Sequence, residues 1–327
     1  MSPMILDEVP AELLPDLRSL RARLAAEIPA KRLDHNLLVA TWNIRAFGDL
    51  TETWIASPDD HPKRNLFALR CIAEIVSRFD VVAIQETRGN IKALRHMLKL
   101  LGPNWGLIMT DVTAGDAGND ERMAFVFDIR RVTTSGLAGE LVVPPEWTRS
   151  EEITPDALRE QFARTPYAVS FSSGRETFIL VTLHVLYGET ASDRLGELHG
   201  IARWLEDWAR REQSWGHNLI ALGDFNIDRK DDDAYKAFTS TGLRAPAELD
   251  SVPRTIFKSG ENAFYDQIAW FTEEGNTNTP VLSMRYSKMA GGFDFQKVVL
   301  PSLSDVELSW RISDHYPLWV EFLIGED

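Results

Sequence analysis

The chain has 327 residues, of which 44% are hydrophobic and 26% are charged, as in an ordinary soluble globular protein. Its formal net charge of −14 argues against a protein that coats polyanions, because non-specific affinity for nucleic acid rests on Lys and Arg at the phosphates. The single cysteine, Cys71, excludes an internal disulfide. The sequence begins without a basic leader, and no apolar run approaches the ~20 residues that a membrane-spanning helix needs. We therefore expect a cytoplasmic protein.

Hydrophobic periodicity predicts an N-terminal helix and then alternating strands and helices. Residues 11–30 carry a helix-like leucine stripe with Pro15 in its first turn, which predicts a helical N-terminal extension over residues 1–35 and a main domain over residues 36–327. The elements predicted in the main domain are strand 37–42, helix 65–79, strand 81–84, helix 91–101, strands 123–126, 168–171 and 178–183, helix 193–211, and strands 218–222, 268–271 and 318–323. This order predicts an α/β fold with mixed sheets and helices on their outer faces.

Six short polar motifs come at or just after the apolar runs of the predicted strands. In chain order they are Thr41–Arg45, Ile84–Glu86, Leu183–His184, Gly223–Asn226, Tyr265–Ile268 and Ser313–Pro317. A sheet collects polar groups at one rim in this way, so we expect these side chains to converge. Together they supply carboxylates, amides and two imidazoles, which suit a Mg²⁺ ion and a phosphate ester. The six motifs in this order therefore predict a metal-dependent phosphoesterase.

Glu86 is the predicted metal ligand, with Asn43 and Asp314 as its neighbours. It comes at the end of a predicted strand, where a carboxylate that faces water costs little and a Mg²⁺ ion can keep several of its waters. Taken alone, Glu86 would be interpreted as a surface residue at the start of a loop. The similar placement of Asn43 and Asp314 favours the metal site.

His184 and His315 are the histidines predicted to transfer protons. Asp266 is placed to orient the imidazole of His315, and an Asp–His pair can activate or position water. His184 needs a partner of its own, for which Glu121 is a candidate.

Asp224 and Asn226 alternate along one extended segment, so their side chains are expected on the same side, where they can meet one phosphate or one water. Asp and Asn also build ordinary turns, but the preceding apolar run and the neighbouring motifs favour a functional role. The chain lacks a Gly-x-Ser-x-Gly elbow and a Gly-Lys-Ser/Thr phosphate loop, so phosphoryl chemistry would rest on metal and acid–base groups.

These motifs resemble those of the endonuclease/exonuclease/phosphatase superfamily, and in particular its deoxyribonuclease I-like branch, over roughly residues 36–325. The most specific segments are Thr41–Gly48, Ile84–Arg88, Gly223–Asn226 and Ile312–Pro317. The resemblance implies a four-layered α/β-sandwich, in which two packed mixed β-sheets are flanked by helices and the site lies at the top of the two sheets.

The resemblance also implies roles for individual residues. Glu86 would hold Mg²⁺, or Mn²⁺ in its place, with Asn43 and Asp314 nearby. Arg164 would contact phosphate, and Arg45 and Arg88 would be DNA contacts. The catalytic set that it implies consists of two acid–base pairs and two groups facing the scissile phosphate: His315 with Asp266, His184 with Glu121, and Asp224 with Asn226.

The chain departs from the nuclease branch at three places. The structural disulfide of that branch cannot form, the N-terminal extension is additional, and Asn119 stands where the branch carries a tyrosine that packs against the DNA minor groove. These departures leave the hydrolytic core intact and predict a weaker preference for duplex DNA.

The predicted function is a Mg²⁺-dependent phosphodiester hydrolase that acts as an endonuclease on DNA. The alternative is a phosphodiesterase or phosphatase for a small-molecule or lipid phosphate ester. Arg88 and Arg164 favour DNA, whereas the acidic net charge favours the alternative. A non-catalytic binding module on this fold conflicts with the presence of both histidines and every metal-side group.

Overall fold

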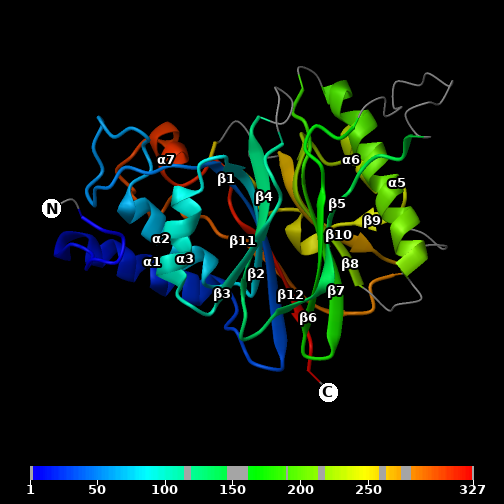
Figure 1. The fold of residues 1–327 in the computed structure, drawn as a ribbon, viewed down its shortest axis with the longest axis horizontal. Coiled ribbons are helices and arrows are strands. Elements are labelled where there is room, and N and C mark those ends of the chain that lie inside the picture. Colours follow the sequence, from blue (N-terminus) through cyan, green and yellow to red (C-terminus); the bar gives the residue numbers. More distant parts are fainter. Residues whose placement is uncertain are drawn as a thin grey trace.

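Two six-stranded mixed sheets pack face to face in the computed structural model, and helices cover both outer faces (Figure 1). The structure describes residues 3–113, 119–145, 161–188, 191–212, 218–257, 263–273 and 281–325. The predicted four-layered α/β-sandwich is therefore confirmed.

The first sheet has the strand order β11-β12-β1-β2-β4-β3. Its strands are β1 (Asn36–Phe47), β2 (Val81–Arg88), β3 (Trp105–Met109), β4 (Glu121–Asp128), β11 (Arg285–Gly292) and β12 (Leu318–Leu323). Within it, β1 and β2 run parallel and the other neighbours run antiparallel.

The second sheet has the order β5-β6-β7-β8-β10-β9. Its strands are β5 (Thr133–Glu140), β6 (Tyr167–Ser173), β7 (Glu176–His184), β8 (Asn218–Ile227), β9 (Leu243–Arg244) and β10 (Phe264–Phe271). Here β7 and β8 form the parallel pair. Each sheet thus has one parallel pair at its centre, whose carboxyl ends deliver side chains to the same rim.

The helices divide between the two outer faces. They are α1 (Leu14–Glu27), α2 (Leu66–Val76), α3 (Lys92–Leu101), α5 (Leu195–Glu212), α6 (Asp233–Thr239) and α7 (Asp305–Arg311), with short 3₁₀ turns η1 (Ala11–Leu13), η2 (Ala191–Arg194) and η4 (Ala247–Leu249). Helices α1, α2, α3 and α7 share a core with the first sheet, and α5 and α6 share one with the second.

Alternation along the strands builds the layers. In β1, Leu37 and Val39 belong to the core between the two sheets, whereas Leu38, Ala40 and Trp42 belong to the core under the helices. Successive strand side chains point to opposite faces, and a strand that is apolar on both faces must be covered on both. The continuous apolar runs of the sequence are the signature of this double burial.

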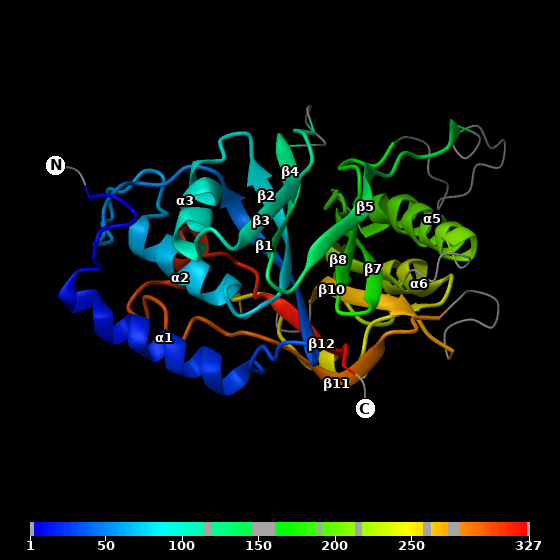
Figure 2. The same cartoon turned by 60° about the horizontal axis from the view of Figure 1, so that its bottom comes forward.

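The N-terminal helix packs on the outside of α2 (Figure 2). Leu17, Leu20 and Leu24 are buried in the core that α1 shares with the first sheet, and Arg21 forms an ion pair with Glu74 of α2, with its Nη2 2.6 Å from Oε1. The predicted boundary between residues 35 and 36 stays a prediction. No helix in the described part of the chain is long and apolar enough to cross a membrane.

Three predicted strand ends are wrong. The strand predicted to end at Asn43 continues as β1 to Phe47, β2 passes Glu86 and ends at Arg88, and β8 passes Asp224 and ends at Ile227. The apolar runs mark only the buried part of each strand, whereas hydrogen-bonded pairing continues beyond it through irregular register. Asn43, Glu86, Asp224 and Asn226 therefore lie within these three strands, near their carboxyl ends.

The sequence analysis also missed several elements: β3, β5, β9, β11, α6 and α7. Strand β5 is largely exposed, β11 is only partly buried, and both carry little apolar alternation, whereas α6 and α7 have only seven residues each. Such segments depend on tertiary contacts rather than on a periodic signal of their own.

Candidate active site

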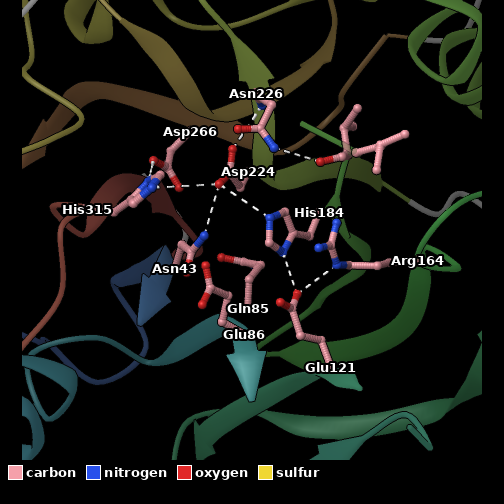
Figure 3. A network of polar contacts seen from close by, with 12 residues as sticks. Asn43, Gln85, Glu86, Glu121, Arg164, His184, Asp224, Asn226, Asp266 and His315 are labelled. Atoms are coloured by element: carbon pink, nitrogen blue, oxygen red, sulfur yellow. Dashed lines mark hydrogen bonds and ion pairs between the residues drawn. The ribbon is translucent and has the colours of Figure 1, made fainter. Parts of the chain in front are cut away.

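The predicted polar residues meet in a cleft of about 400 Å³ at the carboxyl ends of the two parallel strand pairs. Nine of the twelve predicted site residues line it: Asn43, Glu86, Glu121, Arg164, His184, Asp224, Asn226, Asp314 and His315. Asp266 lies behind His315, and Arg45 and Arg88 lie at the edges. Residues from six separate motifs thus come together (Figure 3).

The backbone is irregular where the strands enter the cleft. Glu86 and Asn226 have φ values of 58° and 50°, in the left-handed region that non-glycine residues seldom adopt. Each such conformation costs roughly 1–3 kcal/mol and persists only when its surroundings enforce it. The register between β1 and β2 also shifts after Asn43. Because of these irregularities, side chains that would point elsewhere in a regular strand are turned toward the cleft.

Gly223 permits the close approach of β7 and β8. Its φ is 143°, and a Cβ built on it would lie 2.1 Å from the carbonyl oxygen of Leu183. Any larger residue would push the strands apart. This contact places His184 directly beside Asp224 in the parallel register.

Asp224 lies at the centre of the cleft between the two histidines. Its Oδ2 accepts a hydrogen bond from Asn43 Nδ2 at 2.9 Å and lies 3.7 Å from His184 Nε2 and 3.8 Å from His315 Nε2. Its Oδ1 accepts the backbone N–H of Asn226 at 2.9 Å. Burial alone would raise the pKa of Asp224, but the two imidazoles and these hydrogen bonds lower it. Asp224 is therefore held as a carboxylate.

His315 is paired with Asp266, as the motifs predicted. His315 Nδ1 lies 2.6 Å from Asp266 Oδ2, and the Asp266 side chain has no exposed surface. Burial raises the pKa of Asp266 to about 6, although His315 opposes this. Burial would lower the pKa of His315, but Asp266 and Asp224 raise it well above its usual value. The Nε2 of this imidazole faces the cleft, 3.8 Å from Asp224 Oδ2.

His184 is paired with Glu121 in a similar way. His184 Nδ1 lies 2.9 Å from Glu121 Oε2, which is also 2.7 Å from Arg164 Nε. Asn119 Nδ2 donates to the other oxygen of Glu121 at 2.6 Å. Burial opposes the charge on Glu121, but His184, Arg164 and Arg88 overcome this and lower its pKa. A carboxylate with a lowered pKa thus lies beside the second imidazole.

Glu86, Asn43 and Asp314 together fit a cation. Glu86 lines the cleft, and its Oε2 accepts the backbone N–H of Ala46 at 2.8 Å. The buried Oδ1 atoms of Asn43 and Asp314 have no hydrogen-bond partner among the described residues. Buried oxygens without a donor are costly unless something satisfies them, and carboxylate and amide oxygens are the ligands of hard divalent ions.

A second group, Asp224, Asp266 and His315, places one potential ligand atom from each within 4.8 Å of the others. Most of these atoms are already engaged, since Asp266 Oδ2 is paired with His315 and both oxygens of Asp224 accept hydrogen bonds. Asp266 Oδ1 has no partner among the described residues. The free oxygens of Asn43 and Asp314 make the Glu86 side the better cation site.

The three predicted arginines all contact carboxylates. Arg45 Nη1 lies 3.4 Å from Asp314 Oδ2, Arg88 Nη1 lies 3.4 Å from an oxygen of Glu121, and Arg164 pairs with the same carboxylate. Arg164 alone of the three lines the cleft, and its buried Nη1 has no hydrogen-bond partner among the described residues. Arg164 is therefore the arginine best placed to meet an anion in the cleft.

The sequence analysis missed Gln85, which connects the two sheets beneath the cleft. Its buried Nε2 donates to Thr182 Oγ1 of β7 at 2.8 Å and lies 3.1 Å from Thr41 Oγ1 of β1. It also missed the lining residues Tyr187 and Tyr265. Gln85 and Tyr265 lie inside motifs that the sequence analysis singled out, so their position was a signal, whereas nothing in the sequence marks Tyr187.

Comparison with known proteins gives a family match across most of the chain. The sequence model of the Endonuclease/Exonuclease/phosphatase family matches residues 40–286. A protein of Thioalkalivibrio sp. (strain K90mix) named "Deoxyribonuclease" is 26% identical over 197 residues, which cover 59% of this chain but only 46% of that protein. "Deoxyribonuclease-1" of Bos taurus is 26% identical over 302 residues, which cover 88% of this chain and 93% of that protein.

Solved structures share the fold at lower identity. The structure of D. rerio TDP2 complexed with single strand DNA product has a TM-score of 0.56 and 13% identity, and the match covers 88% of this chain and 98% of that chain. Likeness at this level concerns the arrangement of the two sheets and their helices, so it says nothing about the substrate.

Proposed function

The chain belongs to the endonuclease/exonuclease/phosphatase family of phosphodiester hydrolases, and from this premise we propose that it is a Mg²⁺-dependent endonuclease that cleaves DNA. The observation that carries the proposal is the pair of imidazoles on either side of Asp224. Each has its Nδ1 beside a buried carboxylate and its Nε2 within 3.8 Å of Asp224 Oδ2. Two oriented imidazoles across one cleft suit the two proton transfers of phosphodiester hydrolysis.

The carboxylate partners determine which ring nitrogen works. Asp266 lies beside His315 Nδ1 and Glu121 lies beside His184 Nδ1, so each carboxylate favours a proton on that nitrogen and leaves Nε2 to exchange a proton in the cleft. In the proposal, His315 takes a proton on the side of the attacking water and His184 supplies one to the leaving oxygen. Asp224 and Asn226, which both line the cleft, would face the scissile phosphate.

Glu86, with Asn43 and Asp314, would hold the metal ion, since this side of the cleft offers the unpartnered oxygens. Proteins of this family generally depend on a divalent metal, and Mn²⁺ could take the place of Mg²⁺. When bound, the ion stabilises charge that develops on the phosphoryl oxygens. Arg164 Nη1 would meet the same phosphate from the other side of the cleft.

The names of both curated relatives support DNA as the substrate. One observation favours a second candidate, a phosphodiesterase or phosphatase for a small-molecule or lipid ester. All three arginines expected at DNA contact carboxylates of the chain itself, and the net charge is −14. Few cations are thus free to attract a long polyanion.

The test is plasmid nicking with Mg²⁺ and with EDTA, run beside hydrolysis of a small phosphodiester and a small phosphomonoester. We expect Mg²⁺-dependent nicking that EDTA abolishes. Hydrolysis of the small esters without any nicking would contradict the DNA proposal and favour the second candidate. Inertness toward every substrate, in a folded protein with Mg²⁺ or Mn²⁺, would contradict both.

A further inference from the structure

Two exposed aromatic rings stand at the active-site end of the molecule. Among the large apolar and aromatic side chains that are exposed in the described part of the chain, only Tyr187 and Trp310 are aromatic, at 57% and 43% exposure. Both lie near the cleft rather than elsewhere on the surface. The mechanism proposed above uses neither of them.

Trp310 reaches the cleft through Arg45. It lies in α7, near the upper ends of the strands in Figure 1. The Arg45 guanidinium carbon lies 3.8 Å from the centre of the Trp310 ring, and Arg45 Nη1 lies 3.4 Å from Asp314, which lines the cleft. Ser309 Oγ accepts a hydrogen bond from the same Nη1 at 2.7 Å. The ring is thus held on one side by a fixed cation and remains open to solvent elsewhere.

Tyr187 repeats this arrangement on the second sheet. It follows β7, three residues after His184, and lines the cleft directly. The guanidinium of the buried Arg194 lies 4.8 Å from the centre of its ring, and Arg194 is itself fixed by the carbonyl oxygen of Asn226 and by Asp228. Each sheet therefore contributes one exposed ring that rests on an immobilised arginine.

We propose that Trp310 and Tyr187 are base-stacking subsites that hold unpaired nucleobases on either side of the scissile phosphate. The proposal rests on the proposed nucleic-acid substrate. Aromatic rings beside a phosphodiester site stack bases of any sequence, since every base has a π-face. A ring of this kind needs a base that is not sandwiched in a duplex, so the ligand is single-stranded or locally unpaired nucleic acid.

Charge supports the same conclusion. The protein has a net charge of −14, and Arg45, Arg88 and Arg164 already contact carboxylates. Little electrostatic attraction therefore remains for the phosphate backbone of a nucleic acid. Stacking contributes affinity that does not depend on counterion release. We therefore expect binding that depends on the nucleobases. The part of the affinity that the bases contribute should change little with salt concentration.

The experiment measures equilibrium binding in EDTA, where no cleavage occurs. The probes are two fluorescent oligonucleotides of equal length, one a normal single strand and one with abasic positions around its centre. Wild type is compared with Trp310→Ala, Trp310→Phe, Tyr187→Ala and Val306→Ala. Val306 is a matched control, because it is 60% exposed on the same helix as Trp310.

We expect Trp310→Ala and Tyr187→Ala each to weaken binding of the normal strand by about 5- to 100-fold, the size expected for one stacked base. Binding of the abasic strand should not change, and Trp310→Phe and Val306→Ala should bind as wild type does. Hydrolysis of methyl p-nitrophenyl phosphate with Mg²⁺ should be the same in Val306→Ala as in wild type.

Equal losses for the normal and abasic strands, or equal binding of both strands by wild type, would overturn the stacking subsites. Wild type that binds neither strand would overturn them as well. Base-dependent binding without DNA cleavage under Mg²⁺ would support the subsites while contradicting the proposed endonuclease. If DNA is cleaved and neither Trp310→Ala nor Tyr187→Ala affects the cleavage, the proposed endonuclease is supported and the stacking subsites are contradicted.

Discussion

The first sheet carries a buried polar cluster at each end of the same two parallel strands, and the two clusters differ in how well they are satisfied. At the carboxyl ends of β1 and β2 lies the active-site cluster, with unpartnered oxygens and left-handed backbone. At the amino ends lies a second cluster around Asp80 and Asp128, both without exposed surface. In the second cluster every carboxylate has cations and N–H donors beside it.

Asp80 is the centre of this second cluster. Its Oδ2 accepts the backbone N–H of Leu38 at 2.8 Å, and its Oδ1 accepts Arg131 Nε at 2.6 Å. Asp128 accepts two hydrogen bonds from the guanidinium of Arg130, at 2.8 and 2.6 Å, and one from Lys31 at 3.1 Å. These bonds tie the start of β1 and β2 to the end of β4.

The difference separates binding from stability. A satisfied buried network rigidifies the fold, whereas unpartnered oxygens and strained backbone are tolerated where a ligand completes the site. Substitutions in the active-site cluster should therefore abolish activity without lowering the stability of the fold. Substitutions in the Asp80–Asp128 cluster should lower the stability of the fold without a direct effect on catalysis.

The largest expected effect is the loss of catalysis in Glu86→Ala. Metal stabilisation of the transition state is worth several kcal/mol, on the order of 10³–10⁵-fold in rate. The fold should be little affected, since Glu86 lines the cleft and its side chain is partly exposed. Turnover and thermal melting are measured together at saturating Mg²⁺. The control is Glu140→Ala, an exposed glutamate at the end of β5. Near-wild-type turnover in Glu86→Ala would refute the metal assignment.

The two histidines should lose activity in different ways. His184→Ala and His315→Ala should each slow hydrolysis by roughly 10²–10⁴-fold. A series of substrates with leaving groups of falling pKa should partly rescue His184→Ala, because a good leaving group needs no proton, and should not rescue His315→Ala. Rescue of both variants to the same extent, or of neither, would contradict the division of roles.

Asp80→Ala should break the stability cluster. It would leave Arg131, whose side chain is 8% exposed, without its carboxylate. Removing one partner of a buried ion pair typically costs about 3–5 kcal/mol of unfolding free energy. Denaturant titration measures the loss, with Arg130→Ala as the control, since Arg130 is 60% exposed and should cost at most about 1 kcal/mol. Wild-type stability of Asp80→Ala would show that the two clusters do not differ as described.

The smallest effect concerns acid. Burial would raise the pKa of Asp128, but hydrogen bonds from Arg130 and Lys31 lower it from 3.8 to about 2. A lowered folded pKa contributes stability that is present above pH 4 and is lost as the pH falls from about 4 to about 2, by roughly 1–2 kcal/mol. Denaturant titrations across that range should show a shallower decline for Asp128→Asn than for wild type. An identical decline in the two proteins would show that Asp128 does not contribute to the loss of stability in acid.

Much of the fold could be predicted because its signals are local. The apolar runs of β1, β2, β7 and β8 are buried on both faces, which a sequence displays directly as unbroken hydrophobic stretches. The pairing of His315 with Asp266 could also be predicted, because each lies in a short motif beside a strong strand. The exposed strand β5 and the partly buried strand β11 have no such pattern and were missed.

The sequence by itself determined the residue types at the rim, since the motifs supply the carboxylates, amides and imidazoles at fixed distances from the apolar runs. Only the tertiary structure decided which of their atoms are satisfied. Asn43 Oδ1 and Asp314 Oδ1 lack partners, and Trp310 lies on Arg45, because chain segments more than 200 residues apart are brought together there. Burial, exposure and hydrogen bonding are properties of such non-local contacts, and a periodic pattern in one segment carries no information about the other.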